Sequence, residues 1–161
     1  MDIKRGREIF FECFGNHMII TKEYGDEYEK CHISKECEYE WNKEVRLLLK
    51  SKINESIGCD MLFYVDRYIE LLKGNEAIHY LLTFLKEKEI DSFSSLLLLE
   101  TCKNLVLSTF NSNEKKEYLR EIKSLKDKYL SKPINIDPSY LSNKYCSMIT
   151  IDAIKNRYKK L

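Results

Sequence analysis

From residue 34 onward, apolar residues recur at steps of three and four, the period of an α-helix with one buried face. The stretch after Ser34 places six such residues on one stripe: Cys37, Trp41, Val45, Leu48, Leu49 and Ile53. Further segments of this kind begin at Asp60, Asn75, Asp91 and Asn111. Asp and Asn side chains accept hydrogen bonds from the first turn of a helix. The pattern therefore predicts a predominantly all-α protein.

Short connections between successive helix starts predict antiparallel neighbours, in an irregular helical bundle or a short array of helix pairs. The helix after Asp91 is apolar on more than one face, so we expect it to be central. The helix after Asn111 has only a narrow apolar seam and should be peripheral. Gly74 stands where a left-handed residue would end the helix that begins at Asp60.

Asp137-Pro138 predicts an N-cap followed by proline at the first helical position. We expect two short helices after it, near Ser139–Tyr145 and Ile151–Lys160. The first 33 residues are less uniform. They predict one helix that ends at Gly15-Asn16, followed by a β-prone run at His17–Thr21 that suggests a small N-terminal β-hairpin.

The composition is that of an ordinary globular chain, with 161 residues of which 43% are hydrophobic and 33% charged. This length suits a single helical domain over residues 1–161. Within it we distinguish a mixed helix and hairpin entry (1–33), antiparallel helices (34–131) and a basic helical C-terminal segment (132–161). No apolar run is long enough for a signal peptide or a membrane span. Six irregularly spaced cysteines then indicate reduced thiols, so we expect a cytoplasmic protein without membrane contact.

The segment from Arg7 to Trp41 contains an aromatic pair, a Gly-Asn-His step, a Tyr-rich stretch and a Ser-Lys-Glu helix start followed by Trp. In these features it resembles the opening of a group of small uncharacterised bacterial cytosolic proteins. The likeness covers about the first quarter of the chain. It implies a bacterial origin and carries no activity and no site residues.

Five potential metal ligands fall within 25 residues: Cys13, His17, Cys31, His32 and Cys37. Zinc requires four such ligands that converge tetrahedrally, but no CxxC pair is present and Cys31 and His32 are adjacent. Buried thiols and hydrogen-bonded histidines are the favoured interpretation, so the prediction is no metal and no cofactor. Neither a nucleophile elbow nor a phosphate-binding glycine loop occurs, and we assign no catalytic residues.

The C-terminal segment contains the sharper signal. Residues 138–161 hold five basic side chains against Asp152 alone, a net charge of +4, so the rest of the chain carries −3. Residues 140–158 resemble a helix-turn-helix, with a turn near 146–148, Thr150 as the cap of the second helix, and Ile151, Ile154 and Tyr158 facing inward. In such a motif the second helix enters the major groove. The candidate nucleic-acid-binding residues are Lys144, Asp152, Lys155, Asn156, Arg157, Lys159 and Lys160. The alternative is an amphipathic terminal helix that docks on the bundle.

We therefore expect a non-enzymatic helical protein that binds another protein or regulates it, because grooves between amphipathic helices commonly receive a partner's helix or loop. A DNA-binding regulator that uses the C-terminal segment is the second hypothesis. An enzyme or metal-binding protein that uses the Cys/His cluster is the third. A homodimer is also compatible with the sequence.

Overall fold

The computed structural model describes residues 2–142 and 149–161, and in these residues it contains nine α-helices and no strand. The predicted all-α class is confirmed. The chain divides into two compact units. The first consists of residues 1–55 and 64–71, and the second of residues 56–63 and 72–161. Helix α4 (Gly58–Glu70) supplies residues to both units.

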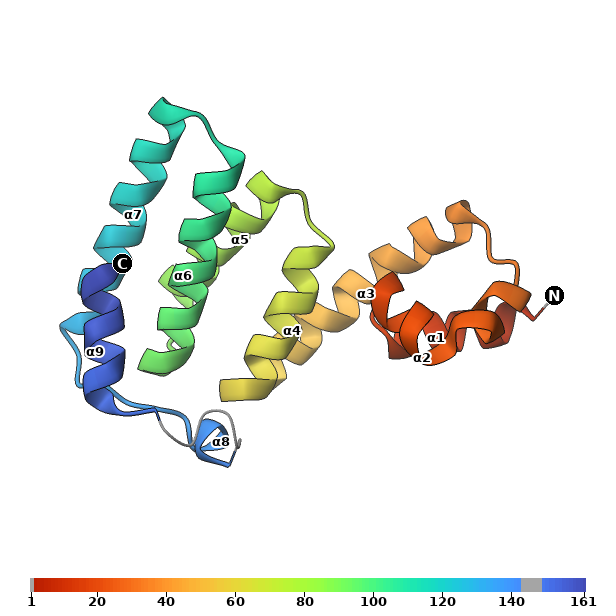
Figure 1. The fold of residues 1–161 in the computed structure, drawn as a ribbon, viewed down its shortest axis with the longest axis horizontal. Helices are drawn as coiled ribbons and strands as arrows, with labels where there is room; N and C mark the ends of the chain where they lie inside the picture. Colours follow the sequence, from red (N-terminus) through yellow and green to blue (C-terminus); the bar gives the residue numbers. More distant parts are fainter. Residues whose placement is uncertain (1, 143–148) are drawn as a thin grey trace. The chain divides into compact units, whose positions relative to one another are not determined.

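Three helices form most of the first unit: α1 (Ile3–Glu12), α2 (His17–Lys30) and α3 (Lys35–Glu55). Helix α1 packs against both α2 and α3 (Figure 1). The core of this contact is aromatic, because the rings of Phe10 and Trp41 lie 5.5 Å apart and both are buried. The α3 stripe is buried at Trp41, Val45, Leu49 and Ile53, as predicted. Leu48 was expected on that stripe, but it is 36% exposed.

The predicted N-terminal hairpin is wrong, because the segment His17–Thr21 is the beginning of α2. The side chain of Asn16 caps this helix by accepting a hydrogen bond from the N–H of Ile19. Phe14 and Gly15 make the turn before it with positive φ angles of 48° and 68°. The β-prone run is therefore helical because a local cap starts the helix and the run places Ile20 in the core.

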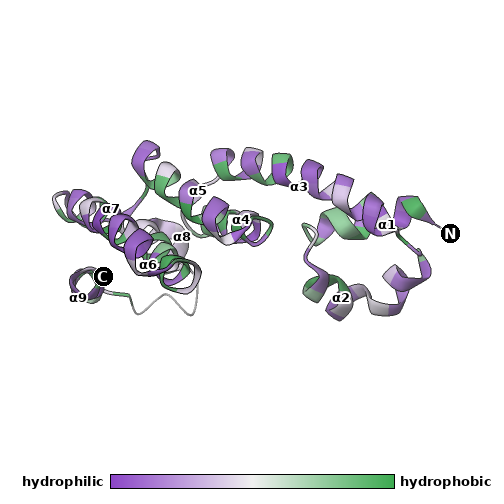
Figure 2. Ribbon diagram, turned by 90° about the horizontal axis from the view of Figure 1, so that it is seen from above, coloured by the Kyte–Doolittle hydropathy of each residue, from purple (hydrophilic) through white to green (hydrophobic). Residues whose placement is uncertain are grey.

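In the second unit, α5 (Gly74–Glu87), α6 (Ser92–Thr109) and α7 (Ser112–Leu130) pack side by side (Figure 1). Helix α6 contacts α5, α7 and the last helix α9 (Ile151–Lys160), which confirms its predicted central position. Most residues of the first half of α6 are buried, whereas α7 buries only Ile122, Leu125 and Tyr129. Hydrophilic residues, in purple, are seen on α7 in Figure 2. Asp91 and Asn111 cap α6 and α7 as predicted.

Gly74 does not end the preceding helix in the left-handed conformation; it is the first residue of α5. Its small size is used for close packing, because an added Cβ would lie 2.8 Å from Oγ1 of Thr109. This contact joins the start of α5 to the end of α6 and is not visible in a local sequence pattern.

The last part of the chain contains α8 (Pro138–Leu141) and α9. Asp137 caps α8 with Pro138 at its first position, as predicted. Helix α9 is capped by Thr150 and packs on α6 and α7 with Ile154 and Tyr158 buried. The prediction that Ile151 also faces inward is wrong, since its side chain is 48% exposed.

Within the described residues, no helix combines the length and the apolar character needed to cross a membrane.

Candidate ligand-binding cleft

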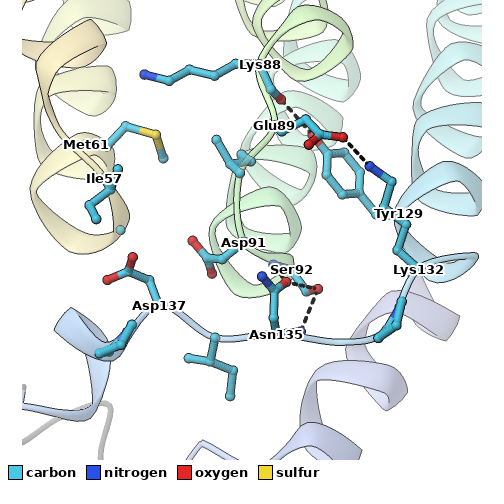
Figure 3. Close-up of a pocket in the computed structure, with 15 residues that line it drawn as sticks. Ile57, Met61, Lys88, Glu89, Asp91, Ser92, Tyr129, Lys132, Asn135 and Asp137 are labelled. Carbon is cyan, nitrogen blue, oxygen red and sulfur yellow. Dashed lines mark hydrogen bonds and ion pairs between the residues drawn. The ribbon is translucent and has the colours of Figure 1, made fainter.

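A cleft of about 610 Å³ opens in the second unit (Figure 3). Three segments line it: the start of α4, the connection from α5 to α6, and the chain that follows α7. Its apolar wall is made by Ile57, Met61, Ile90, Tyr129, Pro133, Ile136 and Pro138. The volume lies within the range of sites that hold small ligands, about 300–1,000 Å³.

Asn135 fixes the chain after α7 against the start of α6. Its side-chain Oδ1 accepts hydrogen bonds from the N–H and the hydroxyl of Ser92, at 3.0 and 2.9 Å. The N–H of Asn135 donates in return to Oγ of Ser92 at 3.0 Å. Two residues are thus joined in both directions, and these bonds hold this wall of the cleft against the start of α6 (Figure 3).

A second set of hydrogen bonds joins the segment after α7 to the start of α4. Ser139 Oγ accepts a hydrogen bond from the N–H of Cys59 at 3.0 Å, and Asp137 Oδ1 accepts one from the N–H of Ser139 at 2.9 Å. Gly58 makes this approach possible with a φ of +53°. A Cβ at Gly58 would lie 2.2 Å from Ser139 Oγ and 2.4 Å from Asp137 Oδ1. Only glycine fits both the space and the backbone conformation.

Two carboxylates, those of Asp91 and Asp137, form one end of the cleft and project into the space below Ile57 (Figure 3). Asp91 Oδ1 accepts hydrogen bonds from the N–H groups of Phe93 and Ser94, each at 3.0 Å. The hydroxyl of Ser94 donates to its Oδ2. Both carboxylates are thereby held as helix caps in fixed positions.

The opposite end of the cleft carries mixed charge. Lys132 Nζ forms an ion pair with Glu89 at 2.6 Å, and this pair lowers the pKa of the Glu89 carboxyl group. Tyr129 lies beside the pair and donates from its hydroxyl to the backbone oxygen of Leu85 at 3.0 Å. Burial raises the pKa of Tyr129 to about 12. Burial lowers the pKa of Lys88, whose ammonium lies 5.5 Å from the centre of the Phe84 ring.

A cluster of buried hydroxyls lies behind the cleft. Ser94 Oγ and the hydroxyl of Tyr140 lie 2.8 Å apart. The hydroxyl of Tyr158 donates to the backbone oxygen of Ser92 at 2.7 Å and is also hydrogen-bonded to Ser95. Burial raises the pKa of both tyrosines. These bonds attach α8 and α9 to the first turn of α6.

The structure also places the candidate nucleic-acid-binding residues, except Lys144, which lies outside the described residues. Five of them are exposed on the outer side of α9: Asp152, Lys155, Asn156, Lys159 and Lys160. Arg157 instead faces α6, where its Nε donates to Oε1 of Glu100 at 3.0 Å and its Nη2 forms an ion pair with the same carboxylate. Arg157 is therefore a docking contact of α9.

Within the described residues, α8 covers Pro138–Leu141 and α9 covers Ile151–Lys160. Helix α9 packs on α6 and α7. The turn predicted near 146–148 lies outside the described residues. Docking on the bundle, the alternative weighed from the sequence, is the arrangement found.

The Cys/His cluster is not assembled into a site. Cys13 and Cys31 are buried, Cys37 is partly exposed, and all three are free thiols. His17 is exposed, and its Nε2 lies 3.2 Å from Oε2 of Glu38. His32 is also exposed. In the part of the chain that the structure describes, no three His, Cys, Asp or Glu side chains are placed to hold a metal ion.

Sequence reasoning did not find the cleft. Asp91 and Asp137 were identified only as caps. Their convergence depends on contacts such as the one between Ser92 and Asn135, which are 43 residues apart. The local signal that the sequence offered was the pair of N-caps, Asp91 and Asp137, each at the start of a helix.

No family model, no curated protein and no solved structure matches this chain. The resemblance of the Arg7–Trp41 segment to small bacterial proteins therefore stays a prediction. The geometry of the chain itself must support any functional conclusion.

Proposed function

We propose that this protein is a non-enzymatic, protein-binding or regulatory module, and that the cleft of its second unit receives a short segment of a partner protein. The observation that carries the proposal is the exposed apolar wall of the cleft. Ile57 is 70% exposed at its rim, although it lies beside the buried Met61. An apolar surface of this kind, in a concave site with fixed walls, favours binding of a partner.

The polar groups of the cleft support binding more than catalysis. Asp91, Ser92 and Asn135 all form hydrogen bonds that hold the walls together. A group that acts as a general base must be able to exchange its proton with a substrate. The carboxylate and hydroxyl groups here are held in place by structural hydrogen bonds, and the acceptor positions that these bonds do not use are suited to a partner's donors.

The proposal is tested with a random heptapeptide display selection against the intact protein and two variants. Ile57→Ser removes the exposed apolar wall, and Leu107→Ser is the matched control on the outer part of α6, where Leu107 is 46% exposed. Selected peptides should bind the wild type and Leu107→Ser equally. They should bind Ile57→Ser about tenfold or more weakly, since burial of such a side chain is worth about 1.5–3 kcal/mol. If no selected peptide depends on Ile57, the proposal is wrong.

A second candidate function is DNA binding through α9, the runner-up from the sequence. The exposed row that contains Lys155, Asn156 and Lys159 favours it. Affinity for duplex DNA should then fall steeply with salt. The double variant Lys155→Ala/Lys159→Ala should reduce the slope of log affinity against log salt by roughly 2, at about 0.9 per phosphate contact. Lys116→Ala/Lys123→Ala on α7 is the control. Equal effects of the two double variants, or no binding at low salt, would exclude this function.

We further propose a bacterial, cytoplasmic setting, as expected from the sequence. Support comes from the cysteines of the described residues, all of which are free thiols, as is usual in a reducing compartment. Rapid alkylation of intact cells followed by mass spectrometry should find Cys37 and Cys59, which are both partly exposed, as reduced thiols. Disulfide-linked forms of either cysteine would contradict this setting.

A further inference from the structure

The chemistry of the cleft indicates which segment it would receive, an inference that rests on the proposed function. We propose that the partner segment carries an arginine or lysine next to an apolar residue. The basic side chain lies between the carboxylates of Asp91 and Asp137, and the apolar neighbour packs on Ile57 and Met61.

The first observation is the charge at one end of the cleft. The carboxylates of Asp91 and Asp137 come from segments 46 positions apart and face the same space (Figure 3). Neither forms an ion pair with any of the described residues. Asp137 Oδ1 accepts a hydrogen bond from the N–H of Ser139, and each carboxylate oxygen has about two acceptor positions. The acidic end therefore keeps acceptor capacity for the donors of a cation.

The second observation is that the cations of the cleft lie elsewhere. Lys132 is paired with Glu89 at 2.6 Å. The ammonium of Lys88 lies near the Phe84 ring, and in Figure 3 its side chain extends at the end of the cleft away from the two aspartates. Because neither lysine neutralises Asp91 or Asp137, an incoming cation is electrostatically complementary and an incoming carboxylate is not.

The third observation is the apolar wall beside the acidic end. Ile57, Met61 and Ile136 line the cleft together with Asp137. Arginine and lysine have long aliphatic stems that lie along apolar surface while the charged group reaches a polar partner. Arginine can in addition donate two parallel hydrogen bonds to one carboxylate. A basic side chain with an apolar neighbour therefore matches both surfaces at once.

The test uses variants that remove charge and keep the helix caps. Asp91→Asn and Asp137→Asn both retain a side chain that caps a helix well, so α6 and α8 keep their starts. Glu117→Gln, an exposed position on α7, is the control for the loss of one negative charge. Circular dichroism and thermal unfolding confirm that each variant is folded before binding is measured.

The probes are the heptapeptides selected on the wild-type protein, each synthesised with arginine and with citrulline at the basic position. Citrulline keeps the shape of arginine and removes its charge. We expect the selected peptides to contain a basic residue beside an apolar one. Citrulline should weaken binding to the wild type and to Glu117→Gln by about tenfold or more. It should weaken binding to the Asp91→Asn/Asp137→Asn protein by less than about threefold, because the charge has lost its partners.

The outcomes separate the two proposals. Peptides that depend on Ile57 but are neutral or acidic, or that bind equally well with citrulline, overturn the basic segment and leave the protein-binding function intact. The same holds if the aspartate variants and Glu117→Gln give equal effects. If no selected peptide depends on Ile57, both the function and the basic segment are overturned.

Discussion

Three serine hydroxyls, those of Ser92, Ser94 and Ser95, are the buried polar side chains of the first turn of α6. Each forms a hydrogen bond to a side chain outside α6. Ser92 binds Asn135, Ser94 binds the hydroxyl of Tyr140, and Ser95 binds the hydroxyl of Tyr158. Buried hydroxyls cost free energy unless they are paired. These serines therefore stabilise one specific arrangement of the C-terminal segment, which apolar contacts alone would fix less strictly.

The change Tyr158→Phe tests this role. Tyr158 is fully buried, and its hydroxyl binds both the backbone oxygen of Ser92 and the side chain of Ser95. Phenylalanine fills the same space but leaves those groups with fewer partners. We expect the free energy of unfolding in urea to fall by about 1–3 kcal/mol. Tyr39→Phe, at a ring that is 64% exposed, should change it by less than about 0.5 kcal/mol. Equal effects would show that the buried hydroxyl contributes nothing.

The buried tyrosines also predict how stability depends on pH. Burial raises the pKa of Tyr129 to about 12 and raises the pKa values of Tyr140 and Tyr158 above the usual value of 10. The unfolded chain therefore loses these protons first as the pH rises. The contribution of these tyrosines to stability should be complete below about pH 10 and then fall by about 1.4 kcal/mol per pH unit for each tyrosine that is still protonated in the folded state. Cys102, whose pKa burial raises to about 12, should begin the decline near pH 9.

Urea unfolding at pH 7, 9, 10 and 11 under reducing conditions measures this decline. Tyr129→Phe is the informative variant. It loses the hydrogen bond to Leu85 and should be less stable than the wild type at pH 7, but its stability should fall less steeply above pH 10 because one titrating group is absent. A free energy of unfolding that stays constant from pH 9 to pH 11 would contradict the prediction.

At the scale of the element, the junction between the start of α4 and the chain before α8 depends on Gly58. Gly58→Ala places a Cβ against Asp137 and Ser139 in a left-handed backbone conformation. Strain of about 1–2 kcal/mol from the backbone adds to the cost of displacing both side chains. We expect a loss of more than about 2 kcal/mol in the free energy of unfolding.

Gly74→Ala is the matched control for Gly58→Ala. Its φ is not left-handed, and its nearest neighbour is the side chain of Thr109, which is exposed and able to rotate. Alanine also favours a helix more than glycine does. The change at Gly74 should stay within about 1 kcal/mol of the wild type. If Gly74→Ala lowers the free energy of unfolding as much as Gly58→Ala does, the left-handed conformation of Gly58 and its closeness to Asp137 do not explain the loss.

Sequence patterns predicted the elements best where the cause is local. The caps at Asp91, Asn111, Asp137 and Thr150 are found, because a cap involves only the next two or three residues. The starts predicted at Asp60 and Asn75 are wrong by one or two residues, since α4 begins at Gly58 and α5 at Gly74. The hairpin at His17–Thr21 is wrong because β-propensity yields to tertiary packing of the helix. The cleft could not be predicted, since three segments separated by dozens of residues meet there.

At the scale of the whole molecule, α4 belongs to both compact units: residues 58–63 to the second and 64–70 to the first. No shift of composition in the sequence marks this division. Each unit contains part of α4, so the unfolding of either unit removes packing contacts from one half of this helix. We therefore expect the two units to unfold together, although each has its own apolar core.

Trp41 makes this expectation measurable, because it is the only tryptophan and is buried in the first unit. Its fluorescence follows the first unit during urea unfolding, whereas far-ultraviolet circular dichroism follows the helices of both. The two midpoints should coincide. Ile53→Val in the first unit and Ile122→Val in the second replace side chains that are 1% and 2% exposed. Each should destabilise by about 0.5–1.5 kcal/mol and shift both midpoints by the same amount. If Ile122→Val moved the circular dichroism transition and left the Trp41 transition in place, the units would unfold independently, and α4 would transmit no stability from one to the other.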